Sequence, residues 1–122
     1  MTAPSTTHRA LTLAADHLTR LGCRVLQRLP SPELAGAALV VRDGDILVLV
    51  AVTWRQTRAE AWHPRDVPVF PRGWVDAHRR LAGAATVRFD AIDILFDDRL
   101  EFVSLAHMRE LAQPPVRTSR AA

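Results

Sequence analysis

The side chains best suited to chemistry in this chain are carboxylates. They occur in three close pairs: Asp43 with Asp45, Asp90 with Asp93, and Asp97 with Asp98. Two carboxylates on one face could hold a divalent metal ion or act as an acid and a base. Side chains alternate along a strand, so Asp90 and Asp93 point to opposite faces and at most one of them reaches a given site. The other pairs are typical of turns. We therefore expect no catalytic carboxylate pair here and no bound metal.

The remaining reactive residue types show no catalytic pattern. The histidines, 5 in all, lack the paired i, i+4 spacing of metal ligands, and no serine has the glycines of a nucleophile elbow around it. The single Cys23 is expected to be a buried thiol, and a lone cysteine agrees with a reducing compartment. The basic residues, 16 in all, are arginines, so no mechanism can use a lysine amine. We expect no cofactor.

Length and composition indicate one globular domain. A chain of 122 residues can bury a single core, and 48% hydrophobic with 24% charged residues is ordinary for such a domain. The domain is expected to cover residues 1–112, followed by a disordered tail over 113–122. No apolar run is long enough to span a bilayer, and the N-terminus has no signal-peptide core, so we expect no membrane partner and a cytoplasmic location.

The first half of the chain predicts a helix followed by three strands. Apolar residues recur at helical spacing over residues 7–21, and Gly22 ends this helix. Residues 23–29 predict an extended segment. Two aliphatic strands then flank a turn at residues 42–45, where Gly44 suits a positive φ, so we expect a β-hairpin. Because the second strand is apolar without interruption, we expect it to be central in its sheet.

The second half predicts further elements around an irregular loop at residues 56–72. A short helix is expected over 74–84 and a strand over 86–95. Residues 100–103 predict an extended piece, and residues 105–111 a helical turn or two. The order α-β-β-β-α-β-β predicts an α/β sandwich around a mixed sheet.

Four segments together resemble the YraN-like family. They are L-T-R-L-G-C-R-V-L at residues 18–26, the turn at 42–45, the strand over 47–55 and V-R-F-D at 87–90. The resemblance extends over about residues 8–110. It implies a restriction endonuclease-like α/β fold, with a central mixed sheet flanked by helices, related to archaeal Holliday-junction resolvases. It also implies that the family's members are nucleases.

The family pattern has charged residues at positions where this chain has none. The family carries G-E-x-D before one hairpin strand and F-V-E-V-K in the next. The aligned positions of its carboxylates and lysine are Gly36, Ala38, Ala51 and Thr53, and a glutamate of its first helix aligns with Leu11. Alanine cannot coordinate Mg²⁺, and threonine offers only a neutral hydroxyl. The resemblance therefore implies a nuclease fold without catalytic residues at this hairpin.

Nearby carboxylates do not replace the missing ones. Asp45 lies about 20 Å from Ala51 along the strand, too far to share one metal ion. Asp90 matches the R-F-D motif of the family, which implies a structural role. We expect an ion pair between Asp90 and Arg88, because the two side chains lie on the same face of the strand.

Basic and aromatic residues gather between residues 54 and 80, where the three tryptophans alternate with arginines. Arginines contact phosphates, and tryptophans stack on unpaired bases. We predict these nucleic-acid-binding residues: Trp54, Arg55, Arg58, Arg72, Arg79, Arg80 and Arg88. The alternative is that the arginines are simply solvated on a loop, while the tryptophans pack against the core.

Three functions remain open at this point. The first is a nuclease-fold protein that binds branched or single-stranded DNA without metal-dependent cleavage. The second is a protein-interaction or regulatory module with no nucleic-acid partner. The third is an active endonuclease whose site has moved. The net charge of +3 permits a polyanion partner but does not distinguish these functions.

Overall fold

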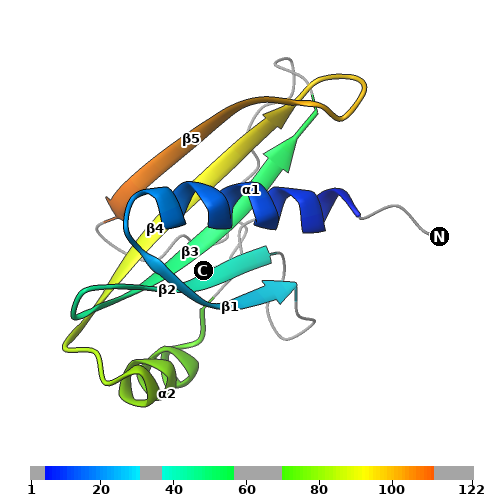
Figure 1. Cartoon of the computed structure of the whole chain (residues 1–122). Coiled ribbons are helices and arrows are strands. Elements are labelled where there is room, and N and C mark those ends of the chain that lie inside the picture. Colours follow the sequence, from blue (N-terminus) through cyan, green and yellow to red (C-terminus); the bar gives the residue numbers. More distant parts are fainter. Residues whose placement is uncertain (1–4, 31–36, 57–69, 112–122) are drawn as a thin grey trace.

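The computed structural model of the chain describes residues 5–30, 37–56 and 70–111. The predicted tail at 113–122 and most of the predicted loop at 56–72 lie outside these residues. The described residues form one mixed sheet with two helices (Figure 1). This architecture confirms the predicted α/β class and is consistent with the restriction endonuclease-like sandwich.

Five strands form the sheet, in the same order as in the sequence. They are β1 (Arg24–Pro30), β2 (Ala37–Asp43), β3 (Ile46–Arg55), β4 (Thr86–Phe96) and β5 (Phe102–Leu111). The hairpin of β2 and β3 is antiparallel, with Asp43 opposite Ile46 next to the turn. Strands β3 and β4 are parallel, and the other neighbouring pairs are antiparallel. Strand β3 is therefore central, as its continuous apolar sequence predicts.

Helix α1 (Thr6–Arg20) agrees with the first predicted helix. The side chain of Ser5 caps its start by accepting a hydrogen bond of 3.0 Å from the backbone N–H of His8. Gly22 follows the helix with a φ of +89°, a conformation that side chains other than glycine rarely adopt. The chain can therefore leave the helix and enter β1 within a few residues.

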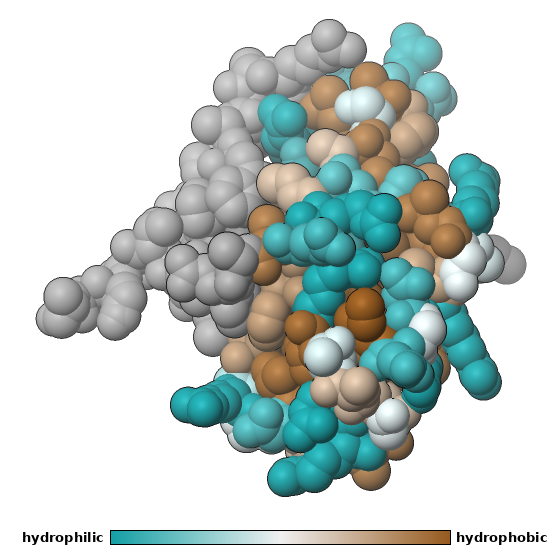
Figure 2. Space-filling view, turned by 90° about the vertical axis from the view of Figure 1, so that its left-hand side faces the viewer, coloured by the Kyte–Doolittle hydropathy of each residue, from teal (hydrophilic) through white to brown (hydrophobic). Residues whose placement is uncertain are grey.

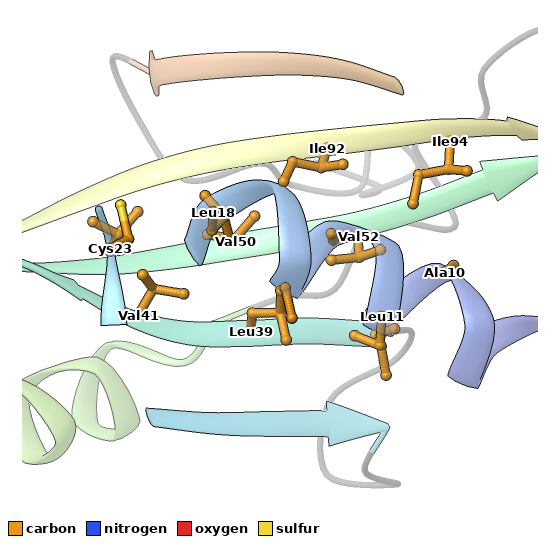
Figure 3. Close-up of a cluster of buried hydrophobic side chains, with 14 of the residues drawn as sticks. Ala10, Leu11, Leu18, Cys23, Leu39, Val41, Val50, Val52, Ile92 and Ile94 are labelled. Atoms are coloured by element: carbon orange, nitrogen blue, oxygen red, sulfur yellow. The ribbon is translucent and has the colours of Figure 1, made fainter. Parts of the chain in front are cut away.

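The apolar side of α1 packs on one face of the sheet. Its buried residues are Ala10, Leu11, Ala14, Ala15 and Leu18. They share a core cluster with alternate residues of the strands, among them Leu39, Val50 and Ile92 (Figure 3). Cys23 belongs to this cluster and is only 8% exposed, which confirms the expected buried cysteine, and burial raises the pKa of its thiol.

Helix α2 (Arg72–Ala82) lies over the opposite face of the sheet and begins and ends slightly earlier than predicted. Its buried residue Val75 clusters with Phe70 and with Leu47 and Leu49 of β3. These β3 residues alternate with the ones that contact α1, so the two helices cover opposite faces. Neither helix in the described part of the chain is long and apolar enough to cross a membrane.

Strand β5 corrects the prediction of a helical turn at residues 105–111. The residues from Phe102 to Leu111 form a strand that pairs with β4, for example Leu105 with Ile94. The segment contains good helix formers, such as Leu, Ala, Met and Glu, and their local preference favours a helix. Pairing with β4 and partial burial of side chains such as Leu105 and His107 override that preference, and neither is visible in the local sequence.

The packing of α1 predicts a clear difference between two leucines. Leu18 is fully buried against the sheet, whereas Leu81 on α2 is 85% exposed. We expect Leu18→Ala to lower the free energy of unfolding by about 2–5 kcal/mol, because it leaves a cavity between helix and sheet. Leu81→Ala should change it by less than about 0.5 kcal/mol. Urea denaturation of both variants checks this, and equal losses would contradict the described packing.

Candidate functional site

The hairpin positions aligned with the family's metal ligands are filled by small apolar side chains. Ala38 of β2 pairs with Ala51 of β3, and Ala51 pairs with Ala91 of β4. Ala38 and Ala51 are fully buried, and Ala91 is 5% exposed. Leu11 lies in the core on the other face of the sheet, and Gly36 is outside the described residues. The structure thus brings Ala38 and Ala51 together but does not join Leu11 to them.

Thr53 follows Ala51 by two residues in β3, so its side chain lies on the same face of the sheet. It contacts a carboxylate. The parallel register places Thr53 beside Asp93. The Thr53 hydroxyl donates to Oδ1 of Asp93 at 2.9 Å, and Nε of Arg55 donates to Oδ2 of Asp93 at 3.0 Å. Thr53 and Asp93 are 7% and 8% exposed, so this cluster is largely removed from water. Local sequence patterns indicate no partner for Asp93, because only the pairing of β3 with β4 brings it next to Arg55.

These residues do not fit a magnesium site. Mg²⁺ needs several oxygen ligands in a near-octahedral shell. Among the described residues near Ala38, Ala51 and Thr53, the carboxylate in contact is that of Asp93, and it forms an ion pair with Arg55. Within residues 5–30, 37–56 and 70–111, no group of three or more His, Cys, Asp or Glu side chains is placed to hold a metal ion.

A second carboxylate, Asp90, is fully buried on the face that α1 covers. Arg88 donates to both of its oxygens, at 3.0 and 3.3 Å, which confirms the predicted ion pair. Nε2 of His107 lies 2.8 Å from Oδ2, and the backbone N–H of Glu110 donates to Oδ1 at 3.0 Å. Burial alone would raise the pKa of Asp90, but the hydrogen bonds from Arg88, Glu110 and His107 together lower it below the usual range.

The hydrogen bonds continue from Asp90 to helix α1. Nδ1 of His107 lies 3.0 Å from Nε2 of His17. When neutral His107 donates Nε2–H to Asp90, its Nδ1 must accept the Nε2–H of His17. Burial of the ring, with His107 and Arg20 nearby, lowers the pKa of His17 from its ordinary value of 6.5. The chain of hydrogen bonds thus links β4, β5 and α1.

Arg88 does not lie with the other predicted nucleic-acid-binding residues. Its side chain is only 9% exposed, and besides Asp90 it contacts Oδ2 of Asp43 at 3.2 Å. Both ion pairs hold the Arg88 guanidinium in a largely buried network, apart from the exposed arginines of the predicted set. Its predicted contact with nucleic acid stays a prediction from the sequence.

The rest of the predicted set is divided between the two ends and faces of the sheet. Trp54 and Arg55 are adjacent in β3, so their side chains point to opposite faces. Arg72 and Arg80 are exposed on α2, which packs near Leu49, about 17 Å along β3 from Trp54. Arg58 lies outside the described residues, as do Trp62 and Arg65.

Two members of the predicted patch have local structural contacts. The ring of Trp74 lies 5.7 Å from that of Phe70 and 3.7 Å from that of His78. Trp74 therefore packs against a residue of its own helix and against Phe70, which precedes α2. The half-buried Arg79 has its Nη1 3.4 Å from the carbonyl oxygen of Ala84. For these residues the structure favours the packing alternative. In Figure 2, hydrophilic residues cover much of the visible surface, with hydrophobic ones in small groups between them.

Comparison with known proteins decides the family. No family model matches the chain. A UPF0102 protein from Pelotomaculum thermopropionicum is 31% identical over 102 residues, which cover 77% of this chain and 83% of the relative. The chain belongs to the UPF0102 family. This is the YraN-like family of predicted endonucleases, so the family resemblance is confirmed.

Because Asp90 is fully buried, replacing it tests how much its ion pair contributes to the stability of this UPF0102 protein. We expect Asp90→Asn to lower the free energy of unfolding by about 3–5 kcal/mol, because Arg88 would keep a buried charge without its main partner. Asp98 is an exposed turn residue, so Asp98→Asn is the matched control and should change stability little. Chemical denaturation compares the two, and a stable Asp90→Asn variant would contradict the role of the network.

The lowered pKa of His17 predicts a loss of stability in mild acid. As the pH falls through the ordinary value of 6.5, the unfolded chain binds a proton at this histidine before the folded chain does. The free energy of unfolding should therefore decrease as the pH is lowered through about 6.5. His17→Gln keeps a donor for His107 without titrating, so this variant should show a smaller fall. His8→Gln, on the exposed side of α1, should behave as the wild type.

Proposed function

We propose that this member of the UPF0102 family binds DNA without cleaving it by a metal-dependent reaction. The observation that carries the proposal is the buried row of Ala38, Ala51 and Thr53, at the positions where the family has two carboxylates and a lysine. Hydrolysis of a phosphodiester in such a fold needs a bound metal ion and a group that activates water. The side chains of this row supply neither.

The contacts of Asp93 support the loss of metal binding. A carboxylate that binds a metal ion must present its oxygens to it. Both oxygens of Asp93 instead accept hydrogen bonds, one from Thr53 and one from Arg55. The guanidinium of Arg55 supplies the positive charge that a metal ion would otherwise supply.

Support for a DNA partner comes from charge and from the family. The chain has 16 basic and 13 acidic residues, for a net charge of +3. Arg72 and Arg80 are exposed on α2, and Trp54 is 38% exposed at the end of β3. Arginines of this kind contribute salt-dependent binding to the phosphate backbone.

The proposal is tested by following binding and cleavage of a labelled branched DNA in the same samples. With Mg²⁺ or Mn²⁺ we expect bound but intact DNA, and the affinity should fall steeply as salt is raised, because counterions compete with arginine. Arg72→Gln and Arg80→Gln together should reduce the salt dependence. Arg88→Gln is not a suitable probe, since it disturbs the buried pair with Asp90.

Two outcomes of this experiment would overturn the proposal. Cleavage by the wild type that requires Mg²⁺ or Mn²⁺ and disappears in an Asp93→Ala variant that is still folded would show an active site among the residues that remain. Absence of binding at low salt would remove the DNA partner. That second result would favour a protein-interaction module, for which the exposed edge strand β5 is the specific observation: Val103 and Met108 are each 40% exposed there.

A further inference from the structure

Aromatic side chains lie across neighbouring strands at one end of the sheet, on the face covered by α1. Phe96 of β4 is fully buried and pairs with Phe102 of β5. The ring of Trp54 of β3 meets that of Phe96 edge to face, with centroids 6.1 Å apart. Trp54 is 38% and Phe102 47% exposed. Two large aromatic surfaces are therefore open to solvent on either side of a buried ring.

A pocket opens beside this aromatic row, between α1 and the start of β5. Its volume is about 320 Å³, and it is lined by His8, Arg9, Thr12, Leu13 and Phe102. Leu13 and Phe102 supply apolar walls, whereas His8 and Arg9 are the basic residues of the lining. Among the residues that the structure describes, no carboxylate lines this pocket.

Arg9 connects the pocket to the aromatic row. Its guanidinium carbon lies 5.3 Å from the centre of the Phe96 ring, within the range of a cation–π contact. Among the residues that the structure describes, Arg9 forms no ion pair with a carboxylate. The contact with Phe96 fixes the guanidinium near the pocket while its N–H groups keep their capacity for an anion.

Flat apolar walls with a cation beside them suit an unpaired base and its phosphate. A base presents a π-face that stacks on aromatic side chains, and its phosphate carries the negative charge that Arg9 would contact. The pocket volume falls in the lower part of the range for small-molecule sites, so it has room for one base rather than a duplex. In a duplex, the base faces are already stacked on their neighbours and cannot enter.

We propose that the pocket between α1 and β5 binds an unpaired base of single-stranded DNA, with Phe102 as the stacking surface and Arg9 as the phosphate contact. This inference rests on the proposed DNA binding, and it names the place on the protein where an unpaired strand binds. Trp54 lies on the far side of Phe96 and provides a second surface for a neighbouring base. The α2 arginines lie on the opposite face of the sheet and remain available for general contact with the backbone.

The test is fluorescence anisotropy of the full chain with a labelled oligothymidylate and with a duplex of the same length. We expect Phe102→Ala and Arg9→Gln each to weaken binding of the single strand by about tenfold or more. Their effect on the duplex should be much smaller. Both positions lie at the surface of the pocket, and thermal denaturation verifies that each variant is folded.

Matched controls separate the pocket from general effects. Val103→Ala removes an exposed apolar side chain next to Phe102, and Arg109→Gln removes the same charge as Arg9→Gln from the other end of β5. Both should leave the preference for the single strand unchanged. In addition, the oligothymidylate should quench tryptophan emission in the wild type, and the quenching should be much reduced in Trp54→Phe.

The outcomes distinguish this inference from the proposed function. If the wild type binds DNA but Phe102→Ala and Arg9→Gln lose no more affinity than their controls, the pocket is not the site, and the proposed function stands. If the wild type binds neither the oligothymidylate nor the duplex at low salt, both fail. Selective loss of single-strand binding in the two pocket variants supports the assignment.

Discussion

The burial of strand β3 on both faces is the constraint on which the rest of the structure depends. Every residue from Leu47 to Thr53 is at most 7% exposed; α1 packs on one side, and α2 packs near Leu47 and Leu49 on the other. A charge at position 51 would have to leave water with no partner among the alanines around it. In this chain the central strand is part of the hydrophobic core, and its buried side chains contribute to stability.

The two buried carboxylates show how this chain solves the problem of burying negative charge. Asp90 and Asp93 lie on opposite faces of β4, and each is paired with an arginine. The planar guanidinium binds a carboxylate through fixed N–H directions and stays charged at all relevant pH values. An arginine side chain is covalently attached and always present, so folding does not depend on the supply of a metal ion. Both buried carboxylates of β4 are therefore compensated by charges within the chain itself.

Local sequence patterns predicted the elements whose partners are close in the chain. The helix α1, the hairpin of β2 and β3, and the pair Arg88–Asp90 all follow from spacing over a few residues. The errors concern contacts between distant segments. The local sequence of residues 105–111 favours a helix, whereas pairing with β4 makes this segment a strand. Likewise, the contact of Arg55 with Asp93 depends on the parallel register of β3 and β4, which no local pattern specifies.

Cys23, buried at the junction of α1 and β1, has a practical consequence. It is the single cysteine of the chain, is 8% exposed, and has a raised thiol pKa, so the folded protein presents almost no thiolate to a reagent. Covalent modification must wait until the helix separates from the sheet. The native sequence thus carries its own reporter of opening: the rate at which a thiol reagent consumes the protein measures how often this core is breached, with no label or mutation introduced.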